Sequence, residues 1–194
     1  MPALDTQTKV AVIGAGAMGS GIAQVAAQAG HHVYLHDQRE GAAEAGRDGI
    51  AKQLQRRVDK GKMQQQELDA IIGRIQPIEN LSEAADTELV IEAIIEDLEI
   101  KRQLLAKLEE LCSFYTILAT NTSSISVTSL FSFIILPFLL FFIHFFFPSP
   151  LISLLDVVIF LSTSYTVSYT FLSSACSFCP YPFSSTSPPV FFLN

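Results

Sequence analysis

Basic residues are missing from this 194-residue chain after Lys107. All 12 Lys and Arg lie between Lys9 and Lys107, and from Ser113 onward there is also no Glu, Gln, Gly, Met or Trp. With a net charge of −7, the chain lacks the basic surface that binds nucleic acid. The first nine residues lack the charged and apolar regions of a secretory signal, and three cysteines are too few for a disulfide framework. We therefore expect a cytoplasmic protein that does not bind nucleic acid.

The composition changes abruptly at Cys112. Of the 19 acidic residues only Asp156 comes later, and all 15 Phe lie at or after Phe114, whereas soluble domains carry about 25% charged residues throughout. One interpretation is a membrane span over 130–147, an apolar run of about the minimum spanning length. Pro137 interrupts that run, and no Lys or Arg flanks it to set an orientation. We favour the other interpretation, a normal domain whose sequence has been altered, because the residues used here are those of pyrimidine-rich codons.

Strands and helices alternate before and just after this break. Runs of apolar and β-branched residues predict strands over 9–13, 32–36, 88–93 and 116–119. Helical spacing of apolar residues predicts helices over 17–29, 40–62, 65–73 and 96–111. Such alternation is typical of an α/β fold with a doubly wound, mostly parallel sheet.

A glycine-rich segment joins the first strand to the first helix. It reads G-x-G-x-x-G over Gly14, Ala15, Gly16, Ala17, Met18 and Gly19. The first glycine permits a tight turn, the second lets the backbone approach a pyrophosphate, and the third lets the helix pack closely on the strand. The helix N-terminus offers N–H groups and a partial positive charge to the phosphates. In this strand–turn–helix context the motif predicts a Rossmann-type dinucleotide site contacted by all six residues.

Asp37 ends the second strand at about the expected distance from the glycines. A carboxylate in this position accepts hydrogen bonds from both hydroxyls of the adenosine ribose, which favours NAD over NADP. Arg39 lies close enough to accommodate a 2′-phosphate, so NADP stays open as an alternative coenzyme.

Together with these residues, later motifs resemble the 3-hydroxyacyl-CoA dehydrogenases, most nearly the bacterial 3-hydroxybutyryl-CoA type. The resemblance is continuous to about Leu130 and includes Ile91-Glu92-Ala93 and Asn121-Thr122-Ser123-Ser124. Beyond Leu130 it keeps the family's spacing in three places, at His144-Phe-Phe-Phe-Pro-Ser-Pro150, Asp156-Val-Val158 and Pro189-Val-Phe-Phe-Leu-Asn194.

The resemblance implies oxidation of an (S)-3-hydroxyacyl-CoA to a 3-ketoacyl-CoA with hydride transfer to NAD, a step of fatty-acid β-oxidation. By motif, His144 would be the base on the 3-hydroxyl and Asp156 would hold its imidazole. Ser123 and Asn194 would complete the catalytic set by bonding the substrate oxygen or the thioester carbonyl, and Ser123 would also contact the coenzyme. The remaining matched positions are Glu96 and Lys101 on the nicotinamide side and Lys60 against CoA.

The chain also departs from the family's pattern. Phe147 replaces an asparagine, Asp156 is one methylene shorter than the usual glutamate, and Val190 replaces a glycine. The chain ends where the family's helical C-terminal domain, which forms its homodimer, would begin. We therefore interpret 1–194 as one NAD-binding domain, with regular sequence over 1–112 and aberrant composition over 113–194. The alternatives are a catalytically inactive NAD-binding remnant and a membrane-associated protein with a Rossmann head.

No metal site is expected from the sequence. Cys176 and Cys179 have the spacing of a metal or redox pair, but no second pair accompanies them.

Overall fold

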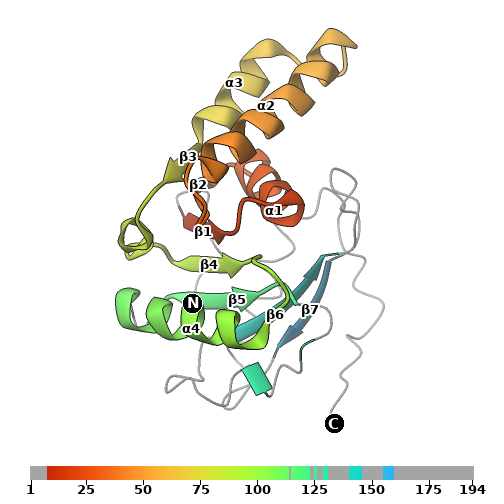
Figure 1. The fold of residues 1–194 in the computed structure, drawn as a ribbon. Coiled ribbons are helices and arrows are strands. Elements are labelled where there is room, and N and C mark those ends of the chain that lie inside the picture. The colour runs from red at the N-terminus through yellow and green to blue at the C-terminus, as the bar shows by residue number, and fades with distance from the viewer. Residues whose placement is uncertain are drawn as a thin grey trace.

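The described strands form one sheet. In the computed structural model the described residues are 8–113, 115–122, 125 and 129–130, together with the backbone of two later strands, 140–145 and 155–159. The strand order is β3-β2-β1-β4-β5-β6-β7 (Figure 1). Every neighbouring pair is parallel except β6–β7, which is antiparallel. The strands are β1 Lys9–Ile13, β2 His32–His36, β3 Ile75–Ile78, β4 Leu89–Glu92, β5 Ile117–Thr120, β6 Leu140–Phe145 and β7 Leu155–Ile159.

Helices connect these strands. Figure 1 shows α2 and α3 side by side in an arm that projects beyond the sheet, while α4 runs along β4 and β5. The helices are α1 Ala17–Gln28, α2 Ala42–Asp59, α3 Gln65–Gly73 and α4 Leu98–Leu111, with a 3₁₀ turn η1 at Leu81–Ala84.

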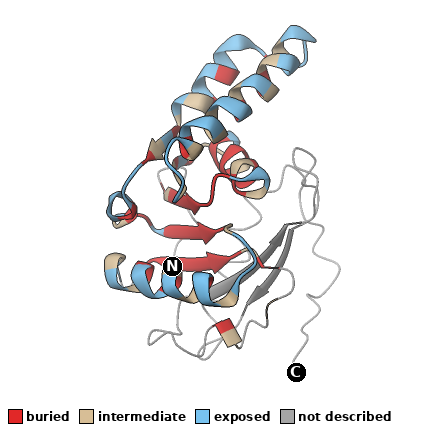
Figure 2. Cartoon of the chain, viewed as in Figure 1, coloured by how far each residue is buried: buried red, intermediate tan, exposed pale blue. Residues whose placement is uncertain are grey.

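Both faces of the sheet are buried. Along β1, Val10 and Val12 join an apolar cluster with residues of α1, α2 and α3, whereas Ala11 and Ile13 join a second cluster with α4. Successive strand residues point to opposite faces, so each face has its own core. Figure 2 shows the result, with buried strands between helices whose outer surfaces are exposed. The doubly wound, mostly parallel sheet predicted from the sequence is confirmed.

The predicted helices and strands are all present, with shifts at their ends. The helix predicted over 40–62 is α2, which stops at Asp59 before Gly61 takes a φ of +67°, a conformation that a helix cannot contain. Strand β3 was not predicted, because Pro77 interrupts its short apolar run. Its place at the edge of the sheet explains how proline is tolerated there.

Part of the apolar run over 130–147 is described, and it contains β6. Among the described residues, no helix is both long enough and apolar enough to cross a membrane.

Candidate coenzyme site

A cavity of about 750 Å³ lies at the carboxyl ends of β1, β2, β4 and β5. In doubly wound sheets, ligands bind at the carboxyl ends of the strands, at the point where the strand order reverses. Here that point lies beside β1. The described lining residues are Gly14, Gly16, Ala17, Met18, Asp37, Gln38, Arg39, Ala93, Ile94, Ile95, Glu96, Ile100, Asn121 and Thr122.

The glycine loop forms the floor of this cavity through very close backbone contacts. Gly14 has a φ of +111°, and a Cβ placed there would lie 2.4 Å from the carbonyl oxygen of Ala93. A Cβ on Gly19 would lie 1.7 Å from the carbonyl oxygen of Gly14. Both distances are far below van der Waals contact, so the tight turn and the close helix packing each depend on glycine.

Gly16 differs from its two neighbours in the motif because its hydrogen points into open space. No described atom lies within 4 Å of a Cβ placed there. Gly16 is the N-cap of α1, and no side chain among the described residues caps this helix. The N–H groups of the first turn have no partner within the helix, so they can bind an anion such as a pyrophosphate beside Gly16.

Asp37 is tied to the glycine loop by its carboxylate. The N–H of Ala15 donates to Oδ2 at 2.8 Å, the N–H of Arg39 to Oδ1 at 3.0 Å, and the Arg39 Nε to Oδ1 at 3.2 Å. Partial burial is the largest single influence on the Asp37 pKa and raises it, but the hydrogen bonds from Arg39 and Ala15 together outweigh it and lower the pKa. The cavity therefore has an ionised acceptor at the end of β2, where the sequence predicts the adenosine ribose.

Replacing Asp37 by Asn tests this acceptor. We expect Asp37→Asn to weaken NADH binding by about 10- to 100-fold, the effect of losing hydrogen bonds to a charged acceptor. NADPH binding should weaken less, because the substitution removes a negative charge beside the 2′-phosphate and frees Arg39. Fluorescence titration with both nucleotides measures the two affinities.

Asp59→Asn is the matched control for this test. Asp59 is exposed at the end of α2, where it accepts only from Gln55 among the described residues, so this variant should bind NADH like the wild type. Equal NADH affinities for Asp37→Asn and the wild type would contradict the assignment of Asp37.

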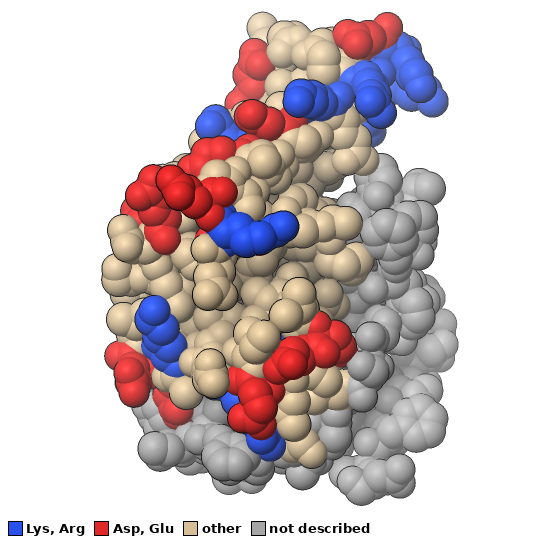
Figure 3. Space-filling view, in the orientation of Figure 1, with Lys and Arg blue, Asp and Glu red and all other residues tan. Residues whose placement is uncertain are grey.

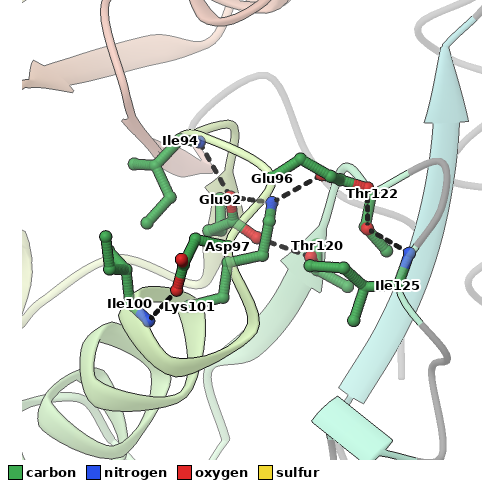
Figure 4. Close-up of polar contacts among 9 residues, drawn as sticks. All are labelled: Glu92, Ile94, Glu96, Asp97, Ile100, Lys101, Thr120, Thr122 and Ile125. Atoms are coloured by element: carbon green, nitrogen blue, oxygen red, sulfur yellow. Dashed lines mark hydrogen bonds and ion pairs between the residues drawn. The ribbon is translucent and has the colours of Figure 1, made fainter.

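The three other described residues predicted to contact coenzyme or substrate, Glu96, Lys101 and Lys60, lie at different places relative to the cavity. Glu96 lines the cavity, whereas Lys101 is fully buried behind it, with its Nζ 3.3 Å from Glu96 Oε2 (Figure 4). Lys60 is exposed at the C-terminal end of α2, just after Arg56 and Arg57 of the last turn. Figure 3 shows Lys and Arg side chains gathered at the far end of the arm, with acidic side chains beside them. The structure thus brings Glu96 and Lys101 together, and it places Lys60 on a separate surface.

His144 and Asp156 lie on adjacent strands. They are directly opposed in the antiparallel pairing of β6 with β7. Several other residues of the sequence analysis lie outside the described residues, namely Ser123, Phe147, Cys176, Cys179, Val190 and Asn194.

Sequence reasoning did not single out Glu92 as a site residue. Its side chain at the end of β4 is fully buried, and Lys101 donates to Oε1 at 2.6 Å. Lys101 follows Leu98 and precedes Leu105 and Leu108 at helical spacing, on the inward side of α4. A lysine in such an apolar row indicates a buried partner, and this was the available signal for Glu92.

Comparisons with known proteins agree with this geometry. The family model described as "3-hydroxyacyl-CoA dehydrogenase, NAD binding domain" matches residues 9–177. The 3-hydroxyadipyl-CoA dehydrogenase of Escherichia coli is 40% identical over 191 residues, which cover 98% of this chain and 40% of that protein. The 3-hydroxybutyryl-CoA dehydrogenase of Clostridioides difficile is 37% identical over 96% of this chain and 66% of that protein.

A solved structure shows the same fold. The crystal structure of 3-hydroxybutyryl-CoA dehydrogenase from E. coli K12 superposes with a TM-score of 0.84 at 41% identity, over 90% of this chain and 37% of that one. The chain therefore spans between 37% and 66% of the length of these relatives. Similarity continues past Cys112, and the family model extends to residue 177. The chain belongs to the family of 3-hydroxyacyl-CoA dehydrogenase NAD-binding domains, and NAD is its cofactor.

Proposed function

We propose that this chain, as one NAD-binding domain over 1–194, carries out the coenzyme-binding and proton-transfer parts of an (S)-3-hydroxyacyl-CoA dehydrogenase reaction. Oxidation of the 3-hydroxyl group removes a proton from its oxygen and a hydride from carbon 3. NAD, when bound, accepts the hydride. The chain's own residues must hold coenzyme and acyl-CoA side by side and take up the proton.

The register of β6 against β7 carries this proposal. His144 is directly opposite Asp156, and directly opposed residues of an antiparallel pair lie on the same face of the sheet. β6 also pairs with β5, and the residues after β5 line the coenzyme cavity through Asn121 and Thr122. His144 is the last residue but one of β6, and because β6 runs parallel to β5, it lies toward the same edge of the sheet as Asn121 and Thr122.

His144 and Asp156 suit the proton transfer. An imidazole titrates near neutral pH, so His144 can take the hydroxyl proton and return it in the reverse reaction. A carboxylate beside it favours the charged imidazolium that forms. Ser123 and Asn194 complete the proposed catalytic set by hydrogen bonding the substrate oxygen or the thioester carbonyl.

An acyl-CoA substrate is supported by the relatives, which are named for 3-hydroxybutyryl-CoA and 3-hydroxyadipyl-CoA. The exposed Lys60, which follows Arg56 and Arg57 at the end of α2, suits the phosphates of CoA. We do not favour membrane association, because the family match extends to residue 177 and so includes the whole apolar run over 130–147. The remaining alternative is an NAD-binding protein without turnover.

The decisive experiment follows NADH absorbance with the full chain and acetoacetyl-CoA. We expect loss of NADH that requires acetoacetyl-CoA, and in the forward direction reduction of NAD with the (S) but not the (R) isomer of 3-hydroxybutyryl-CoA. His144→Gln should lower the rate by about 100-fold or more, the contribution of a general base.

His36→Gln is the matched control, because His36 ends β2, and its Nδ1 lies 3.3 Å from the backbone oxygen of Ile78. This variant should keep the wild-type rate. NADH binding without acetoacetyl-CoA-dependent oxidation would overturn the dehydrogenase proposal and favour the binding protein.

A further inference from the structure

A cluster of buried polar groups lies directly behind the coenzyme cavity. The Glu92 carboxylate accepts three hydrogen bonds, from Lys101 Nζ at 2.6 Å, from the N–H of Ile94 at 2.8 Å and from Thr120 Oγ1 at 2.5 Å (Figure 4). The side chains of Glu92 and Lys101 are both 0% exposed. The cluster joins β4, α4 and β5 at one point.

This arrangement is not explained by stability alone. Two charges taken out of water lose their hydration, and a pair of apolar side chains in the same place is often as stable or more so. Apolar side chains would not, however, fix the position of neighbouring polar groups. A buried ion pair in which every donor and acceptor is hydrogen bonded holds its members in one geometry. What the cluster holds in place therefore matters more than what it contributes to folding.

The cluster is bonded to residues that line the cavity. Lys101 Nζ lies 3.3 Å from Glu96 Oε2, and Thr122 Oγ1 donates to the other oxygen of Glu96. Glu96, Thr122 and Ile94 all line the cavity, whereas Glu92 and Lys101 are not among the described lining residues. Figure 4 shows the path from Glu92 through Lys101 to Glu96 and Thr122.

These lining residues lie at one end of the cavity. Asp37 follows β2 on one side of β1, whereas Ile94 and Glu96 follow β4 and Thr122 follows β5 on the other side. A dinucleotide crosses this edge with its adenosine over the β2 side and its pyrophosphate at the glycine loop. The residues bonded to the cluster therefore face the nicotinamide half.

We propose that Glu92 is a positioning residue for the nicotinamide half of NAD. It holds the Lys101 ammonium and the Ile94 N–H, and through Lys101 it sets where the Glu96 carboxylate and the Thr122 hydroxyl lie. Glu92 itself touches neither coenzyme nor substrate. This inference rests on the NAD site of the proposed function and adds a residue on which that site depends.

The test compares two ligands that share the adenosine half. NADH and ADP-ribose both engage Asp37 and the glycine loop, but only NADH carries a nicotinamide. In the full chain we expect Glu92→Gln to weaken NADH binding about five- to tenfold, the usual size of an effect transmitted through a contact network. Its affinity for ADP-ribose should stay within about twofold of wild type, since sites without shared partners behave independently.

Glu99→Gln is the matched control, because Glu99 lies in the first turn of α4 and makes an exposed ion pair with Arg102 at 2.7 Å. It should change neither affinity. Equal weakening of NADH and ADP-ribose by Glu92→Gln would show that Glu92 only supports the fold, and no weakening would show that the network does not reach the ligand. Either result overturns the inference. A wild-type chain that binds neither ligand would instead overturn the coenzyme site, and this inference with it.

A second pair of variants keeps the test valid should Glu92→Gln not fold. Thr120→Val removes one donor to Glu92 and leaves both charges in place, whereas Thr120→Ser keeps the donor. We expect Thr120→Val to weaken NADH binding selectively and Thr120→Ser to restore it. The same NADH affinity in both variants would contradict the proposal.

Discussion

Gly19→Ala should destabilise the fold by about 3 kcal/mol or more, at or above the upper end of the usual cost of overpacking. The added Cβ would lie 1.7 Å from the Gly14 carbonyl oxygen and 2.8 Å from its carbon, so α1 or the preceding turn must move. The turn has little freedom to do so, because the N–H of Gly14 donates to His36 O at 2.7 Å. Unfolding in urea, followed by circular dichroism, gives the change in the free energy of unfolding.

Gly49→Ala is the control for this substitution. Gly49 is an exposed residue within α2, and no described atom lies within 4 Å of a Cβ placed there. We expect it to stabilise the chain by about 0.5–1 kcal/mol, because alanine loses less conformational freedom in a helix. If Gly19→Ala proved as stable as Gly49→Ala, the close contact of Gly19 in α1 with Gly14 in the turn after β1 would be contradicted.

Lys101→Met should cost about 3–5 kcal/mol of folding free energy, the usual penalty for removing one partner of a buried ion pair. Methionine fills a similar volume and keeps the helix propensity of α4, so packing and helix formation change little. The loss arises because the Glu92 side chain, 0% exposed, would no longer have beside it the cation that offsets the lost hydration of its carboxylate. The measurement is again the urea midpoint at constant slope.

Two further variants isolate the charge effect. Lys107→Met lies in the same helix on its exposed side and should stay within about 0.5 kcal/mol of wild type. Adding Glu92→Gln to Lys101→Met should recover most of the lost stability, because the unpaired charge is then removed. A double variant no more stable than Lys101→Met would show that packing, and not charge, causes the loss.

Local patterns predicted most of the fold from the sequence. β1, the glycine turn and α1 form one contiguous segment, so apolar spacing and the glycine motif identify them without knowledge of distant contacts. Asp37 could also be found, because its distance along the chain from the glycines is itself part of the motif. Such features depend on neighbours in sequence.

The features that were missed depend on contacts between distant parts of the chain. Glu92 ends β4, where a glutamate is ordinarily exposed to solvent, so its residue type gives no sign of burial. Only folding brings Lys101 and Thr120 to it. β3 contains a proline, which is acceptable only because β3 ends up at the sheet edge. The opposition of His144 to Asp156 likewise depends on how β6 pairs with β7, and the sequence alone offers a motif resemblance for these residues but no register.

The position of the cavity along the chain has a consequence for synthesis. Every described residue that lines it lies between Gly14 and Thr122, ahead of β6 and β7. A ribosome produces the N-terminal part first, and that part can fold while the rest is being made. We therefore expect that NAD can bind once the chain has emerged through Thr122, and that by mass action it stabilises the partly formed sheet. β6 and β7 belong to the part of the chain with almost no charged residues. They can then pair, β6 first, against the open edge of a β5 strand that has already formed.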